Sequence, residues 1–273
     1  MDECKTKYPL LLVHGMGFRD RKHLNYWGRI PKKLTDRGAR VFYGNQDSAG
    51  SVEKNAETVA RSLVNALEET GAEKVNIIAH SKGGLEARYL AANGFGDRIA
   101  SITTMNTPHN GSLTVDRLMR FPRWMVVFTA KCTDLWMRLL GDKNPDALSC
   151  FDMFTTAAAE KFAIDNPTPE GIFCQSFGFK MKNARSDILM MIPYLIVKRC
   201  DGENDGLLSE RAVKWENYRG MYTSVTNRGI SHPDEVDIRR MRFSKKQPAN
   251  DHEISDITEF YISVVAGLKE MGL

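Results

Sequence analysis

The stretch from Val75 to Tyr89 constrains the fold of this 273-residue chain more than any other. It begins with a short apolar, partly β-branched run typical of a buried parallel strand and continues with helix-forming residues. Ser81 lies at the bend between the two. A serine on so sharp a strand-to-helix turn needs small residues two positions before and after it, and Ala79 and Gly83 meet that need. The stretch therefore predicts a nucleophile elbow with Ser81 as the nucleophile.

The elbow also predicts where negative charge could be stabilised. A serine at the start of a helix lies beside free amides and the positive end of the helix dipole, so the N–H of Lys82 is one candidate oxyanion donor. The motif has alanine where glycine is usual, and an ordinary strand-to-helix turn with a surface serine is the alternative interpretation.

A second donor is expected in the loop after the first apolar run, Tyr8 to Val13. That run ends in a glycine-containing loop, as strands do at the carboxyl edge of an α/β sheet, and we assign the Met16 N–H as the second donor. A plain glycine turn is the alternative. His14, in the same loop, is expected to make structural hydrogen bonds.

The order of predicted elements is strand, helix, strand, helix, strand, which implies a mostly parallel sheet with helices on both faces. We therefore expect an α/β chain with one domain over residues 1–273. The elements beside the elbow are predicted as helices at Trp27 to Asp36 and Ser51 to Glu68, strands at Arg40 to Tyr43, Ile99 to Thr104, Ile172 to Phe179 and Tyr222 to Thr226, a further apolar run at Ile188 to Val197, and a terminal helix over Ile254 to Val264.

Residues 113–166 differ from the rest because they are unusually rich in Trp, Met and Phe. The segment follows a loop at the predicted catalytic edge, so we interpret it as a helical lid that covers an apolar cleft and contacts lipid transiently. Packed core or a dimer contact is the alternative, and the sequence leaves a monomer or a dimer open.

Composition excludes several classes of function. The net charge is +4, and 38 Lys and Arg are interspersed with 34 Asp and Glu, which argues against nucleic acid. No apolar run reaches about 18 residues, so no transmembrane segment is expected. Five scattered cysteines without C-x-x-C spacing, and no visible signal peptide, predict a cytoplasmic protein; a secreted protein whose signal has been removed is the alternative.

Ser81, Asp205 and His232 occur in the chain order Ser, acid, His, each in a loop after a predicted strand or apolar run. A serine hydroxyl becomes nucleophilic when an imidazole takes its proton, and the imidazole needs an acid to orient it. These three residues are therefore the predicted catalytic triad. The remaining alternatives are Asp201 or Glu203 as the acid and His252 as the base, while His109 is expected to structure its loop.

In six separate stretches the chain resembles the bacterial triacylglycerol lipases of the family I true-lipase group. The matching stretches are Tyr8-Pro9 through His14-Gly15-Met16, Asn25-Tyr26-Trp27 with Ile30-Pro31, Val75-Asn76 through Gly84, Thr107-Pro108-His109-Asn110-Gly111-Ser112, Asn204-Asp205-Gly206-Leu207, and His232-Pro233-Asp234-Glu235-Val236.

The resemblance implies an α/β-hydrolase fold, an ester hydrolase without organic cofactor, and the triad and oxyanion donors given above. It also implies a structural calcium ion held by Asp187 and Asp234, since carboxylate oxygens suit that ion. Lys82 departs from the family pattern, in which His, Gln or Met often follows the serine, and no disulfide is evident.

We therefore predict a serine carboxylic-ester hydrolase that cleaves acylglycerols or related lipid esters through an acyl-enzyme on Ser81. The alternatives are a short-chain esterase, a phospholipase or an acyltransferase of the same fold, because pocket depth decides among these. A non-catalytic protein that binds a lipid or protein partner is a further alternative from another class.

Overall fold

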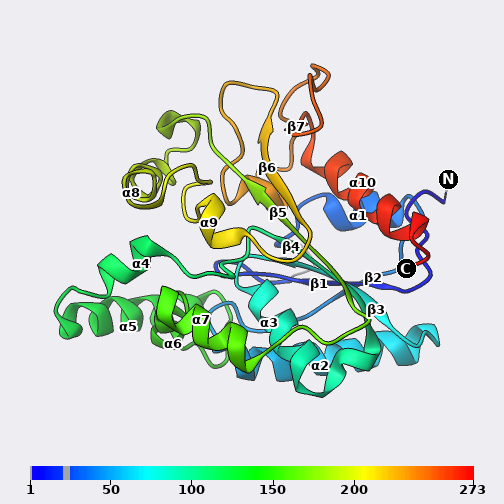
Figure 1. Ribbon diagram of the computed structural model, residues 1–273, viewed down its shortest axis with the longest axis horizontal. Helices are drawn as coiled ribbons and strands as arrows, with labels where there is room; N and C mark the ends of the chain where they lie inside the picture. The colour runs from blue at the N-terminus through cyan, green and yellow to red at the C-terminus, as the bar shows by residue number, and fades with distance from the viewer. Residues whose placement is uncertain (1, 21–24) are drawn as a thin grey trace.

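The computed structural model describes residues 2–20 and 25–273 (Figure 1). Its centre is a seven-stranded sheet in the order β2-β1-β3-β4-β5-β6-β7, and every neighbouring pair is parallel. The strands are β1 (Leu10–Val13), β2 (Val41–Tyr43), β3 (Val75–His80), β4 (Ile99–Met105), β5 (Phe173–Phe179), β6 (Tyr218–Ser224) and β7 (Glu253–Ile254).

Helices cover both faces of this sheet. The α-helices are α1 (Ile30–Thr35), α2 (Val52–Thr70), α3 (Gly83–Leu90), α4 (Leu113–Leu118), α5 (Arg123–Leu139), α6 (Ala147–Met153), α7 (Thr156–Asp165), α8 (Met191–Asp201), α9 (Glu210–Val213) and α10 (Ile257–Glu270). Short helical turns of other types are η1 (Ala91–Phe95), η2 (Gly96–Arg98), η3 (Ala184–Ser186) and η4 (Asp234–Val236).

Alternation along the central strands produces two apolar cores. In β1, Leu10 and Leu12 face the core formed with α1 and α10, whereas Leu11 and Val13 face the core formed with α2 and α3. Both helix layers are visible on opposite sides of the sheet in Figure 1. Because successive side chains of a strand point to opposite faces, a strand covered on both sides must be apolar throughout. The predicted α/β class, with a parallel sheet between helices, is confirmed.

One predicted apolar run forms a helix and not a further strand. Residues 188–197 were predicted only as an apolar run, and unlike the apolar runs of the sheet most of them lie in a helix, α8. Pro193 explains the difference, because proline removes a ladder hydrogen bond from a strand but is tolerated in the first turn of a helix, where its missing N–H has no intrahelical acceptor. Asp205 therefore follows a helix.

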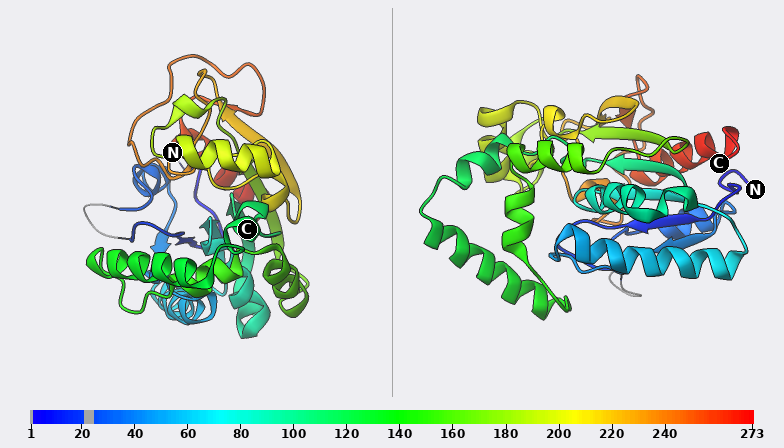
Figure 2. Two further views of the ribbon diagram at one scale, coloured as in Figure 1. Left: turned by 90° about the vertical axis from the view of Figure 1, so that its left-hand side faces the viewer. Right: turned by 60° about the horizontal axis from the view of Figure 1, so that its bottom comes forward.

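Residues 113–166 form the four helices α4 to α7 between β4 and β5. Figure 2 shows α4 and α5 extending from one end of the sheet, away from the layers that cover its faces. Of the helices in the described ranges, none combines the length and apolar character that crossing a bilayer requires.

Candidate active site

Ser81 occupies the turn between β3 and α3 with a φ of 54°, a left-handed conformation that costs energy for a residue with a side chain. The surrounding backbone leaves no room for larger neighbours. A Cβ added to Gly83 would lie 2.4 Å from the carbonyl oxygen of Val13, and one added to Gly15 would lie 2.7 Å from the Cβ of Ser81. The small residue expected two positions after the serine is thus required by the close approach of β1.

Asp205 and His232 are joined by a short contact of 2.5 Å between Asp205 Oδ2 and His232 Nδ1. The acid is fully buried and its turn is rigid, because Oδ1 accepts from the amides of Leu207 and Leu208 at 2.7 Å each. Burial alone would raise the pKa of Asp205, but the facing imidazole and the donated hydrogen bonds lower it below its ordinary value. An ionised Asp205 accepts a hydrogen bond from Nδ1–H and leaves Nε2 of His232 free to act as a base.

Ser81 and His232 line the same cavity, which has a volume of about 580 Å³. Met16 lines it as well, and Lys82 is the N-cap residue of α3, where the first amides of a helix have no intrahelical acceptor. The remaining walls are apolar and come mainly from α4, α5, α6 and α8: Val115, Leu118, Met125, Val126, Phe151, Ile196 and Val197. The residues predicted for the triad and the oxyanion donors are therefore placed at one apolar cavity or directly behind it.

The alternative triad members lie elsewhere in ordinary contacts. Asp201 pairs with Arg211 at 2.9 Å, and Glu203 pairs with Lys180 at 2.6 Å. His252 is exposed and packs on the ring of a tyrosine in β6. None of these side chains contacts the cavity that holds Ser81.

Two other histidines have the structural role expected for them. His14 is buried, and its ring nitrogens contact the carbonyl oxygens of Gly15 at 2.8 Å and Gln46 at 3.1 Å. His109 is buried against the ring of Trp215 and contacts Thr104 Oγ1 at 3.0 Å. Burial and a neighbouring guanidinium lower the pKa of His109 well below its ordinary value, so the imidazole stays neutral in its loop.

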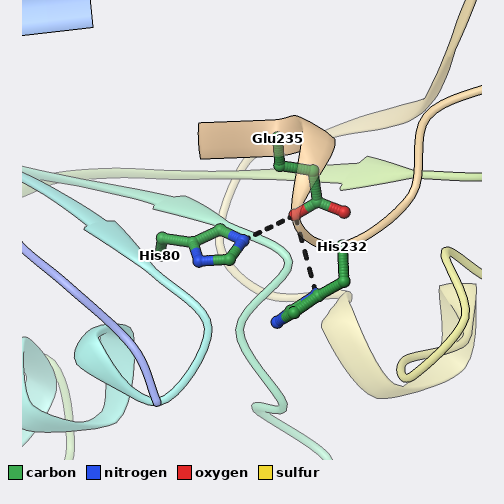
Figure 3. Close-up of side chains that lie close together, drawn as sticks. All are labelled: His80, His232 and Glu235. Carbon is green, nitrogen blue, oxygen red and sulfur yellow. Dashed lines mark hydrogen bonds and ion pairs between the residues drawn. The ribbon is translucent and has the colours of Figure 1, made fainter. Parts of the chain in front are cut away.

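A buried network behind the triad was not predicted from the sequence. Glu235 Oε2 contacts His80 Nε2 at 2.8 Å and lies 3.8 Å from His232 Nδ1 (Figure 3). The side-chain amide of Asn106 donates to both acids, at 2.6 Å to Asp205 and 2.7 Å to Glu235. Burial, and then repulsion by Asp205, raise the pKa of Glu235 well above its ordinary value. Glu235 is therefore a neutral carboxylic acid beside an ionised one.

His80, His232 and Glu235 are also the one group in the described ranges that brings three potential metal ligands together, with ligand atoms within 4.8 Å of one another. The atoms of this group that lie closest together are already engaged: His80 contacts Tyr26 Oη at 2.7 Å and Glu235, and His232 Nδ1 contacts Asp205. A neutral acid that is hydrogen-bonded to the imidazole of His80 and lies 3.8 Å from that of His232 fits a hydrogen-bond network better than a metal site.

Asp187 and Asp234, the positions that the resemblance implies as calcium ligands, do lie together. Ser231 Oγ is 2.8 Å from Asp187 Oδ2 and 2.9 Å from Asp234 Oδ2. Both carboxylates also contact the guanidinium of Arg239. The positive charge between the two acids is supplied by the chain itself, so this donor set does not fit the implied ion.

Lys82, the residue after the predicted nucleophile, has a buried side chain that joins α3 to the loop before α2. Its Nζ donates to the carbonyl of Gly50 at 3.0 Å and pairs with Glu86 one turn along α3. Although burial works against the charged form, Glu86 keeps the pKa of Lys82 above its ordinary value. Lys82 does not line the apolar cavity, and its ammonium group fixes the first turn of α3.

Comparison with known proteins agrees with this geometry. The model of the alpha/beta hydrolase fold family matches residues 8–149, slightly more than half of the chain. A triacylglycerol lipase of Vibrio cholerae is 38% identical over 113 residues, which are 41% of this chain and 36% of that protein. One of Pseudomonas fragi is 38% identical over 118 residues, which are 43% of this chain and 40% of that protein. Each match therefore spans less than half the length of the bacterial relative.

Longer matches come from more distant proteins. Triacylglycerol lipase 2 of Saccharomyces cerevisiae is 26% identical, over 99% of this chain and 78% of that protein. The crystal structure of Staphylococcus hyicus lipase aligns with a TM-score of 0.68 at 18% identity, over 98% of this chain and 97% of that chain. The metagenomic carboxyl esterase MGS0156 aligns with a TM-score of 0.71 at 14% identity, over 97% and 76% of the two chains.

At such identities the two structures show the fold, whereas the bacterial sequences confirm the expected resemblance to triacylglycerol lipases. The matched residues 8–149 include strands β1 to β4 and the strained turn of Ser81. This chain belongs to the alpha/beta hydrolase fold family.

Proposed function

We propose that the chain is a serine ester hydrolase that cleaves lipid esters. The observation that carries the proposal is one apolar cavity of about 580 Å³ that is lined by both Ser81 and His232, with Asp205 hydrogen-bonded behind the imidazole. An apolar cavity with a few convergent polar groups is what an enzyme needs to bind an acyl chain and act on its carbonyl.

The reaction follows from the groups at the cavity. His232 Nε2 takes the hydroxyl proton as Ser81 Oγ bonds to the ester carbonyl carbon, and the amides of Met16 and Lys82 stabilise the resulting oxyanion. His232 then gives the proton to the departing alkoxide, which leaves as the alcohol. The acyl group remains bonded to Ser81 Oγ as an acyl-enzyme. Water repeats the sequence: His232 takes one of its protons, the hydroxide attacks the acyl carbon, and Ser81 Oγ regains a proton as the acid leaves. All of these groups belong to the chain, so no organic cofactor enters the reaction.

Acylglycerols are the substrate class that we favour. The walls contributed by α4, α5, α6 and α8 are almost entirely apolar, and the relatives named as triacylglycerol lipases support the same substrate. Short-chain esters, phospholipids or transfer to an alcohol would use the same chemistry and differ in how the cavity fits the substrate.

Helices α4 and α5 support the proposal that residues 113–166 act as a lid that contacts lipid. Side chains of both helices line one wall of the cavity, whereas Trp124 and Phe128 of α5 are 71% and 65% exposed. Further exposed apolar side chains in the lid are Leu118, Phe121, Leu135, Trp136 and Leu139. Exposed aromatic residues beside the mouth of an apolar cavity suit a lipid–water interface.

Two measurements test the catalytic proposal. Ser81→Ala should lower turnover of p-nitrophenyl butyrate by on the order of 10⁴-fold or more, and should abolish labelling by a fluorophosphonate probe. Ser263→Ala on α10 is the matched control, since it removes a serine hydroxyl that bonds to the carbonyl of Phe260. If the unaltered protein were labelled but did not turn the ester over, Ser81 would be an activated nucleophile and hydrolysis would be refuted. If the unaltered protein showed neither labelling nor turnover, the non-catalytic binding role would be favoured.

Substrate class and lid are tested with a series of esters from acetate to stearate and with emulsions. Activity confined to the shortest esters would count against acylglycerols. Trp124→Ser with Phe128→Ser should lower hydrolysis of emulsified tributyrin while leaving the soluble butyrate ester unaffected. The control is Met271→Ser, which removes an apolar side chain that is 47% exposed and lies outside the lid, after α10; an equal loss in the control would refute a specific lipid contact.

We also propose a reducing, cytoplasmic compartment. All five cysteines are free, and three of them, Cys4, Cys150 and Cys174, are buried at separate places in the fold. Unpaired thiols are typical of a reducing compartment, which supports the proposal. Cell fractionation distinguishes this location from secretion.

A further inference from the structure

The loop that carries His232 is fastened by a cluster of three charged side chains: Asp187, Asp234 and Arg239. Asp187 lies directly after η3, whereas Asp234 and Arg239 follow His232 in the chain. Both aspartates are buried, and Ser231 Oγ lies between them at 2.8 and 2.9 Å. Two carboxylates this close repel one another unless a cation lies between them.

Arg239 is that cation. Its Nη2 lies 2.9 Å from Asp187 Oδ2, and its Nε lies 3.0 Å from Asp234 Oδ1. The planar guanidinium thus contacts one carboxylate with each of two nitrogens, a geometry that a single point charge cannot copy. The side chain of Arg239 is 31% exposed, so it closes the cluster from the solvent side.

The other oxygen atoms of the pair are also engaged. Asp187 Oδ1 accepts from the amide of Leu189 at 3.0 Å, and Asp234 Oδ2 faces the hydroxyl of Ser231. Calcium takes 6–8 oxygen ligands that point their lone pairs at the ion. Here N–H and guanidinium donors point at the oxygens instead, so an ion would have to displace Arg239 and then sit among hydrogen-bond donors.

We propose that Arg239 takes the place of the calcium ion that the resemblance implies, so that this protein holds its histidine loop without a divalent cation. Arg239 acts as a positioning residue through two steps. It pairs with both Asp187 and Asp234, which hold Ser231, and the next residue is His232, whose amide donates to the carbonyl of Asp205 at 2.9 Å. Loss of the guanidinium would leave two buried acids facing each other beside the base.

The test compares Arg239→Gln, Arg239→Lys and a control, Arg242→Gln, which removes an exposed arginine from the same loop. Thermal unfolding is measured for each after dialysis against a chelator and again in millimolar calcium. We expect Arg239→Gln to lower the unfolding midpoint by roughly 3–8 °C relative to the control, because it exposes the repulsion between the two acids. Arg239→Lys should recover part of the loss, since it restores the charge without the planar fork.

The unaltered protein decides the question even if Arg239→Gln does not fold. Its midpoint and its binding of terbium, a luminescent substitute for calcium, should be the same before and after chelation. A midpoint that falls on chelation and returns with calcium would overturn the proposal, as would an Arg239→Gln protein as stable as Arg242→Gln. Because unfolding is measured without substrate, failure here is distinct from failure of the proposed ester hydrolysis.

Discussion

The two acids near His232 should respond very differently to removal of their charge. Asp205→Asn and Glu235→Gln are isosteric changes at carboxyl groups that lie 2.5 and 3.8 Å from the same imidazole nitrogen, His232 Nδ1. The structure indicates that Asp205 is ionised and Glu235 is neutral, since the pKa of the first is lowered and that of the second is raised well above its ordinary value. An amide should therefore replace Glu235 far better than Asp205.

The size of each effect follows from the hydrogen bonds. In Asp205→Asn the side-chain oxygen is needed at the Oδ1 position, where two amides donate, so the NH₂ group must face His232 Nδ1. Nδ1 would then accept, Nε2 would carry the proton, and His232 could not take one from Ser81. We expect a loss of about 10⁴-fold in kcat.

In Glu235→Gln both contacts survive. The amide oxygen can accept from Asn106 at the Oε1 position, and the NH₂ group can donate to His80 Nε2 at the Oε2 position. The cost is of the order of one neutral hydrogen bond, about 1 kcal/mol or a factor of roughly five in kcat.

Steady-state hydrolysis of a soluble ester at neutral pH measures both losses, and thermal unfolding over a range of pH adds a second test. Because the pKa of Glu235 is higher in the folded than in the unfolded protein, its contribution to stability is fully present below its unfolded pKa and is lost as pH rises through the folded value. Glu235→Gln should remove this decline towards alkaline pH. If Glu235→Gln were as inactive as Asp205→Asn, Glu235 would have to act as an ion, and the assignment of the two protonation states would be refuted.

Three further outcomes follow from the geometry of the elbow and the cavity. Gly83→Ala should abolish activity and lower the unfolding midpoint, since the new Cβ would lie 2.4 Å from the carbonyl oxygen of Val13; normal kinetics would show that β1 can move away. Lys82→Met should destabilise the fold by about 3 kcal/mol in urea unfolding, because it leaves the buried Glu86 without a cationic partner; an unchanged midpoint would mean that the hydrogen bond from Asn55 is enough to hold Glu86. Val126→Trp should shift the ester-length profile towards shorter acyl chains by filling part of the cavity, and an unshifted profile would place the acyl chain elsewhere.

The fold and much of the candidate site could be predicted because their signals are local. A few consecutive residues around Ser81 are enough to predict the elbow. The structure shows its strained φ and its close backbone contacts. The parallel sheet followed from apolar runs that alternate with helical periodicity. The chain order of the triad pointed to the contact between Asp205 and His232, although Asp205 follows the helix α8 and not a strand.

The features that were missed depend on contacts between remote segments. Asn106 and Glu235 are 129 residues apart, and nothing near either one indicates that a single amide joins two acids. Nothing in the sequence around Arg239 distinguishes it from a surface arginine, whereas in the fold it lies between Asp187 and Asp234. The helix α8 is different in kind, because Pro193 argues against a central strand and the apolar run could have been predicted as helical from the sequence alone.

These remote contacts share one function in the architecture. The short segment from Ser231 to Arg239 contains hardly any regular structure beyond the single turn of η4, so its own hydrogen bonds cannot fix the imidazole. It is held instead by side chains that each reach a different part of the fold: Asp237 bonds to Arg29 just before α1 at 2.7 Å, Glu235 bonds to Asn106 after β4, and Arg239 bonds to Asp187. A base proposed to act on Ser81 from an irregular loop needs such external anchors, and a hydrogen-bond network and an arginine provide them here from within the chain.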